Sequence, residues 1–173
     1  VGCVTVCDYS GQVLHEFREL DDKWDVSYAA DVGLVIAASD VHIAGWDIET
    51  GRRKFLWRIA SEMSIGATAV SPDGSRVYFA ATNEQGGKEL RMLDVASQVE
   101  NVLVRVRSCL CLAMSPDGRW LAFVSDRGQE GSKPQIYLIP TDGGEARRLR
   151  DMENGAGSPE WSPSGECLAF TSR

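Results

Sequence analysis

The side chains of this chain that could carry out chemistry are five cysteines, two histidines and several aspartates that precede turns. Two cysteine pairs, Cys3 with Cys7 and Cys109 with Cys111, have spacings that place each pair on one face of a strand. Zinc sites use C-x-x-C pairs or histidine partners at fixed spacing, and the sequence contains neither. The pattern therefore predicts no metal and no other cofactor, and the thiols are expected to act as small buried side chains.

The histidines and aspartates form no catalytic pattern either. His15 and His42 each stand alone on a predicted strand, where a histidine is more often structural than catalytic. Asp47 and Asp94 each follow an apolar position directly before a turn, where the carboxylate of an aspartate accepts backbone hydrogen bonds. The aspartates of two Ser-Pro-Asp-Gly turns are interpreted in the same way. No G-x-S-x-G nucleophile elbow occurs, so no catalytic residue is assigned.

The elements that position these residues repeat along the chain. The turn Ser115–Gly118 recurs 44 residues earlier as Ser71–Gly74 and 47 residues later as Ser162–Gly165. A second anchor runs in parallel, since Trp46-Asp47 before a turn recurs as Cys7-Asp8, Leu93-Asp94 and Ile139-Pro140. A period in the forties that holds four short strands is typical of a β-propeller blade.

The repeat predicts an all-β fold, a β-propeller of four-stranded antiparallel blades with about four blades' worth of chain. Three full blades are expected at residues 25–64, 65–107 and 108–157, and two half-blades at residues 1–24 and 158–173. The half-blades either pair to close a small ring or belong to a larger one, and the larger ring is favoured. The aromatic positions expected to be buried between the sheets are Trp46, Trp120, Phe123 and Trp161.

A family resemblance rests on the third repeat and the end of the chain. Residues 115–149, with Ser125-Asp126-Arg127 and Gly143-Gly144-Glu145, and residues 162–173 resemble the TolB-like propeller repeat. The same repeat is similar to the propeller domain of prolyl-oligopeptidase-family serine peptidases, and residues 35–52 resemble a WD repeat. The resemblance is specific for the fold and leaves the function open, because propellers serve many unrelated roles.

The resemblance implies one of two functions. The first is a non-catalytic propeller that binds or gates peptide or protein substrates for a serine hydrolase whose catalytic domain lies outside this chain. The alternative is a TolB-like or WD-repeat scaffold for protein–protein interaction. Whether the longer protein is an enzyme stays open, and a G-x-S-x-G motif downstream would distinguish the two.

Composition limits the partners. The formal net charge of −7 argues against nucleic-acid and anionic-membrane surfaces, since both require clustered Lys and Arg. No apolar run approaches the roughly 20 residues that cross a bilayer. A protein or peptide partner is expected, together with self-association through open propeller edges. Five thiols without a disulfide framework favour a cytoplasmic location, whereas a TolB-like role implies a periplasmic one.

The binding surface is expected on the irregular face of the propeller. In a four-stranded blade the first-to-second and third-to-fourth strand turns form one face, which we call the turn face. The other connections form the opposite face, the loop face, and here they differ in length and charge. Variable loops on a rigid scaffold are where binding usually resides. The residues predicted to border the binding site are Trp24 as an aromatic anchor, Asn83, Glu84, Arg127, Gln129 and Glu130.

Overall fold

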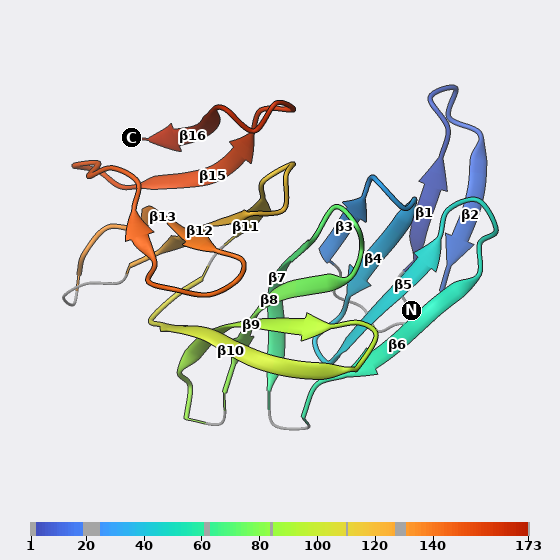
Figure 1. The fold of residues 1–173 in the computed structure, drawn as a ribbon, viewed down its shortest axis with the longest axis horizontal. Coiled ribbons are helices and arrows are strands. Elements are labelled where there is room, and N and C mark those ends of the chain that lie inside the picture. Colours follow the sequence, from blue (N-terminus) through green and yellow to red (C-terminus); the bar gives the residue numbers. More distant parts are fainter. Residues whose placement is uncertain are drawn as a thin grey trace.

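The chain folds into an open arc of antiparallel sheets. The computed structural model describes residues 3–18, 25–60, 63–83, 85–109, 111–126 and 131–172. Across these residues there are sixteen strands and no helix, and three four-stranded sheets are flanked by two two-stranded hairpins. The sheets follow one another along the arc, with the hairpins at its two ends (Figure 1). The predicted all-β, four-stranded architecture is confirmed.

Each sheet is a simple meander in sequence order. The first hairpin contains β1 (Val4–Cys7) and β2 (Val13–Phe17). The first full sheet contains β3 (Asp25–Ala29), β4 (Leu34–Ala38), β5 (His42–Asp47) and β6 (Arg53–Arg58). The second contains β7 (Ser64–Val70), β8 (Arg76–Thr82), β9 (Lys88–Asp94) and β10 (Val99–Val106). The third contains β11 (Leu112–Met114), β12 (Trp120–Ser125), β13 (Gln135–Pro140) and β14 (Arg147–Arg148). The last hairpin contains β15 (Ala156–Trp161) and β16 (Leu168–Ser172).

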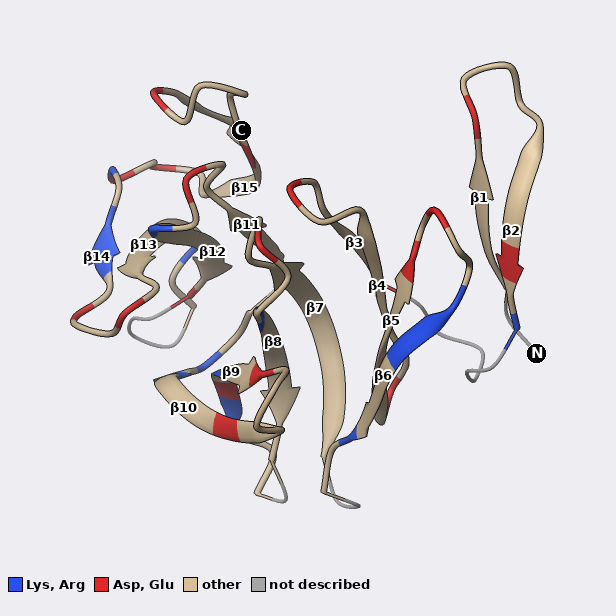
Figure 2. Ribbon diagram, turned by 45° about the vertical axis from the view of Figure 1, so that its right-hand side comes forward, with Lys and Arg blue, Asp and Glu red and all other residues tan. Residues whose placement is uncertain are grey.

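Aspartates build the short turns, as the sequence predicted. The Asp47 carboxylate accepts the Thr50 N–H and hydroxyl, each at 2.8 Å, and Asp94 accepts the Ser97 N–H at 2.9 Å. The hydrogen bonds from Thr50, with a contribution from Lys54, lower the pKa of Asp47 to about 2. These carboxylates are therefore ionised and occupied by their own turns. Figure 2 shows acidic residues on the turns from β3 to β4 and from β5 to β6, whereas Lys and Arg lie on outer strands such as β6 and β14.

The turns of neighbouring sheets also contact one another. Gly118 has a φ of +70°, and a Cβ added there would lie 3.1 Å from the Pro72 ring of the preceding sheet. Gly165 has a φ of +72°, and its added Cβ would lie 3.5 Å from the Pro116 ring. The left-handed backbone favours glycine at both positions, and at Gly118 the close Pro72 ring leaves little room for a side chain as well.

The core lies between the sheets, where the apolar faces of adjacent sheets pack together. Phe79 and Ile36 are fully buried between the first two full sheets, and Phe123 between the second and third. Trp46 is buried where the first hairpin packs on β3–β6, and its ring stacks on Phe17 with centroids 4.7 Å apart. The predicted burial is therefore confirmed for Trp46 and Phe123.

Trp120 and Trp161 correct that prediction. Both are half-buried at the junction with the last hairpin. This hairpin has two strands, β15 and β16, and covers the third full sheet incompletely. The two tryptophans therefore keep part of their surface exposed.

The cysteines correct a second expectation. Cys109 is buried, and burial raises its pKa to about 12, which makes it an inert thiol. Cys3 and Cys7 are exposed instead of buried. Cys3, Thr5 and Cys7 alternate with Val4 and Val6 along the strand, and it is the valine face that packs against the rest of the protein.

A bulge in β10 breaks the strict alternation that its sequence predicts. Val102 lies opposite Arg91, but Val104 lies opposite Leu90, on the other face of the sheet. The two valines therefore point in different directions, although they are two residues apart. Leu103 and Val104 both contact the apolar layer between the second and third full sheets.

The open arc leads to a first prediction, that the purified chain self-associates. β1 and β16 belong to different sheets and lie at opposite ends of the arc, so each leaves one edge unpaired (Figure 1). Val26 and Tyr28, on one face of β3, are each more than half exposed. Unpaired edges and exposed apolar faces promote association. Light scattering across a dilution series should therefore detect species larger than a monomer.

A lysine on the exposed edge hairpin provides the control. Ala169 is exposed on β16, and Ala169→Lys should shift the equilibrium toward the monomer, because edge charges oppose strand pairing. A wild-type chain that is monodisperse and melts cooperatively as a monomer would contradict the prediction.

Candidate functional site

The connections of the loop face are tied to one another by hydrogen bonds. The ends of β6 and β8 lie together at the lower edge of the arc (Figure 1). The Asp40 carbonyl, after β4, accepts the Ile65 N–H of β7 at 2.7 Å. Asp126, after β12, exchanges two hydrogen bonds with the Ser108 hydroxyl, which precedes β11. Each loop is thus anchored to the strand entry beside it.

The structure places one of the predicted site residues. Asn83 directly follows β8 at the loop face, and its Oδ1 accepts the N–H groups of Gln85 at 3.1 Å and Gly87 at 2.9 Å. The Oδ1 atom of Asn83 therefore shapes its own turn, while its Nδ2 donates to Glu89 Oε1 at 3.5 Å. The other predicted residues, Trp24, Glu84, Arg127, Gln129 and Glu130, lie outside the described residues.

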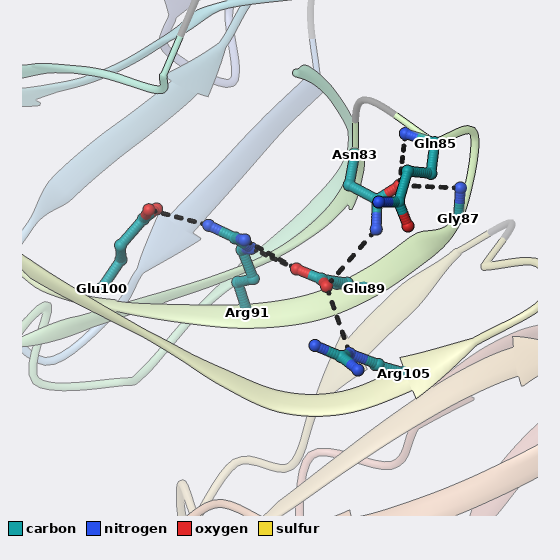
Figure 3. Close-up of polar contacts among 7 residues, drawn as sticks. All are labelled: Asn83, Gln85, Gly87, Glu89, Arg91, Glu100 and Arg105. Carbon is teal, nitrogen blue, oxygen red and sulfur yellow. Dashed lines mark hydrogen bonds and ion pairs between the residues drawn. The ribbon is translucent and has the colours of Figure 1, made fainter. Parts of the chain in front are cut away.

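Beside Asn83 lies a charged network that the sequence analysis missed (Figure 3). Glu89 on β9 has only 6% of its side chain exposed, and its Oε2 accepts Arg91 Nε at 2.9 Å and Nη2 at 2.6 Å. Arg91 Nη1 also donates to Glu100 Oε1 at 2.7 Å. Arg105 on β10 lies 3.5 Å from Glu89 Oε1.

The network is a structural one. The bonds from Arg91 lower the pKa of Glu89 even though burial opposes this. Glu89 and Arg91 share the face of β9 that carries Leu93, next to the apolar layer of the first two full sheets. Two glutamates and two arginines balance in charge, and no nucleophile stands among them. The sequence shows a Glu-x-Arg pair on a half-buried strand. It does not show the pairing register with β10, and that register brings Glu100 and Arg105 to the pair.

A cavity of about 500 Å³ adjoins the loop that follows β12. Gln135 forms two hydrogen bonds with the Met152 backbone, at 2.8 and 3.0 Å, which fixes the connection from β14 to β15. Arg148 pairs with Asp151 at 2.8 Å. Both charge signs are therefore present in this cavity, whose lining is Asp126, Ser132, Lys133, Gln135, Tyr137, Arg148, Asp151, Met152 and Glu153.

The innermost strands line two further cavities, of about 430 and 300 Å³, along the axis of the arc. Both include Ser27 of β3, Thr68 of β7 and Leu112 of β11, so they adjoin at these residues. We call the two together the channel. Small side chains such as Ala67 and Ala113 leave it open.

Within the described part of the chain, no group of three or more His, Cys, Asp or Glu side chains is arranged to hold a metal ion. The same residues include no helix with the length and hydropathy of a membrane span. The described geometry thus offers cavities and polar surfaces for binding, on a scaffold of packed sheets.

Stacked four-stranded antiparallel meanders around a channel define the β-propeller class, here as a partial ring. Residues 32–173 match the sequence model of the TolB beta propeller domain family. The chain belongs to this family.

Individual relatives agree with the family assignment. The chain is 54% identical over 57 residues to "Uncharacterized peptidase YuxL" of Bacillus subtilis, covering 33% of this chain and 8% of that protein. It is 34% identical over 95 residues to "Tol-Pal system protein TolB" of Hydrogenovibrio crunogenus, covering 55% and 21%. The crystal structure of TolB from Acinetobacter baumannii matches with a TM-score of 0.74 and 22% identity, over 99% of this chain and 43% of that one. The chain therefore spans less than half the length of these relatives.

Proposed function

We propose that this chain is a non-catalytic propeller module that binds peptide or protein substrates and controls their access to a separate hydrolase domain. The observation that carries the proposal is the 57-residue segment that is 54% identical to a protein named a peptidase. That segment makes up 8% of the peptidase-named protein, and the present sequence has no nucleophile elbow. Catalysis is therefore assigned to residues outside this chain.

The loop face is the proposed binding surface. It carries the cavity bounded by Lys133, Tyr137 and Arg148, and its connections differ from sheet to sheet. The turn face offers little freedom, because its aspartates and glycines are committed to turn geometry and to contacts between sheets. The predicted residues remain part of this proposal: Trp24, Asn83, Glu84, Arg127, Gln129 and Glu130.

A scaffold that binds folded proteins is the second candidate, and the matches to proteins named TolB favour it. Those matches also favour the periplasmic location that the sequence offered as its alternative, and none of them supports the cytoplasmic one. Retention of a folded protein, but not of the peptides produced by its digestion, would favour the scaffold.

Shortening one loop tests the binding face. Ser125 and Gln135 lie directly opposite each other on β12 and β13, so a short turn can join the two strands. Replacing residues 127–132 with Asn-Gly keeps Asp126 and its bonds to Ser108. We expect an unchanged melting temperature and about tenfold weaker binding of fluorescein-labelled random dodecapeptides, measured by fluorescence anisotropy.

A turn-face variant provides the matched control. Asp142 is exposed on the turn from β13 to β14, and Asp142→Lys should leave peptide binding unchanged. If Asp142→Lys abolishes binding while the shortened loop does not, the binding face is the opposite one. If the wild-type chain binds neither peptides nor folded proteins, the proposed function is wrong.

A further inference from the structure

The channel differs from the loop-face cavity in its charge. Its lining includes two carboxylates, Asp25 on β3 and Glu160 on β15, and no lysine or arginine. The remaining lining residues are apolar, small or hydroxyl-bearing. Carboxylates in a concave site attract cations more strongly than they do on an open surface, because the walls exclude part of the solvent.

Asp25 is held in place for such a contact. Its Oδ2 accepts the backbone N–H of Thr68 and, at 2.8 Å, the Thr68 hydroxyl. The Ser27 hydroxyl donates to the Thr68 carbonyl at 3.3 Å, which adds a second link between β3 and β7. Asp25 Oδ1 makes no hydrogen bond within the described part of the chain. One oxygen therefore fixes the carboxylate, and the other stays available to a cation.

Glu160 lies near the opposite end of the channel, beside aromatic side chains. The Glu160 side chain is exposed, and it forms no ion pair with any residue that the structure describes. Tyr28 and Trp161 line the same cavity, and Trp161 Nε1 donates to the Ala113 carbonyl at 3.1 Å, which fixes the indole. A carboxylate beside aromatic rings is the environment that ammonium and guanidinium groups prefer.

The spacing along the channel fits an extended chain. Glu160 and Tyr28 occupy the same repeat position, each two residues before its turn. Tyr28 lies three residues after Asp25 on the same strand, a rise of about 10 Å. A peptide in extended conformation covers about the same length with three residues.

We infer that the channel binds an extended cationic peptide segment, with Asp25 and Glu160 as the partners of two basic groups about three residues apart. The inference rests on the proposed peptide-binding function and goes beyond its loop-face site, because it adds the channel as a second place of contact and names the class of peptide. The basic groups are lysine or arginine side chains, or a free amino terminus in place of the first.

A charge-matched peptide series tests the inference. The probes are fluorescein-labelled, acetylated dodecapeptides of alanine and serine that carry two lysines three residues apart, or norleucine at the same two positions. We expect the lysine peptide to bind at least about tenfold more tightly than the norleucine peptide in 50 mM salt, with a smaller difference at higher salt. Equal affinities for the two peptides would overturn the inference.

Isosteric variants locate the contact. Asp25→Asn keeps an oxygen for both Thr68 donors, and Glu160→Gln alters an exposed side chain, so the second variant serves if the first unfolds. Each variant should bind the lysine peptide about fivefold more weakly than the wild type and bind the norleucine peptide with unchanged affinity. Glu49→Gln makes the same charge change on the exposed turn from β5 to β6, outside the channel and the loop-face cavity, and should have no effect.

Two other results would separate the possibilities. An equal loss in Glu49→Gln and Asp25→Asn would mean non-specific attraction to an acidic protein and would overturn the channel assignment. If random dodecapeptides bind but the lysine peptide gains nothing, this inference fails and the proposed function stands. If no peptide binds at all, both fail.

Discussion

Replacing Phe123 with alanine should lower the free energy of unfolding by about 3–5 kcal/mol. Phe123 is fully buried at the centre of β12, and its ring stacks on Tyr137 with centroids 5.6 Å apart. Leu121 and Ile139 pack in the same layer and are also fully buried. Because β12 is hydrogen-bonded to β11 on one side and to β13 on the other, its backbone cannot move into the space left by the ring, and the cavity persists.

Urea denaturation followed by tryptophan fluorescence and circular dichroism measures this loss. Val102→Ala is the control, because Val102 is nearly half exposed and its truncation should cost less than about 1 kcal/mol. A loss below about 1 kcal/mol for Phe123→Ala would show that β12 does not have the register described above.

Replacing Arg91 with methionine should cost about 2–4 kcal/mol, because it leaves two carboxylates close together without their shared cation. Glu89 is almost completely buried, and one oxygen of Glu100, Oε2, is buried without a hydrogen-bond partner in the described residues. Arg105 remains 3.5 Å from Glu89 and offsets part of the loss. Arg105→Met is the matched control, and since 83% of that side chain is exposed, its cost should stay below about 1 kcal/mol.

The pH dependence of the Arg91→Met variant has a defined sign. In the wild type, Arg91 holds the pKa of Glu89 below its ordinary value, so the stabilisation is present above the unfolded-state pKa. This stabilisation is lost as the pH falls through the folded-state pKa of Glu89, which lies below the unfolded-state value. In Arg91→Met the burial of Glu89 acts without that opposing cation and raises its pKa. The stability gap between the two proteins should therefore be widest at neutral pH and narrow below about pH 4.5.

A gap that stays constant between pH 7 and pH 4 would contradict this account of Glu89. So would equal losses for Arg91→Met and Arg105→Met. Denaturation curves of the three proteins at both pH values are sufficient to decide.

The strands could be predicted from the sequence because two turn motifs fix their ends. Ser71–Gly74 and Ser115–Gly118 each specify a turn chemically. β7 ends at Val70, directly before the first turn, and β8 and β12 each begin two residues after a turn glycine. The bulges could not be predicted in this way. Nothing local distinguishes Val102 from Val104, and the choice depends on how β9 presents Arg91 and Leu90 to β10.

The candidate site was less accessible to sequence reasoning than the fold. The place of Asn83 in a variable loop predicts a binding residue, and only the structure adds its turn-forming hydrogen bonds to Gln85 and Gly87. The sequence does not distinguish Asp25 as a site residue, because a single aspartate at the start of a strand matches no motif. Its role depends on Thr68, 43 residues away, and only the packing of β3 against β7 brings the two together.

The contact between successive turns gives the arc a direction. Each contact joins a turn glycine of one sheet to side chains of the sheet before it: Gly118 meets Pro72, Gly165 meets Pro116, and Gly74 meets Val32 and Leu34. The two surfaces that meet are different, so the interface is heterologous and has no two-fold axis. Copies that associate by repeating this contact join head to tail, and such assemblies stop growing only when the rotation closes a ring. Self-association of this chain through its end faces should therefore give closed rings or open filaments, and not a symmetric dimer.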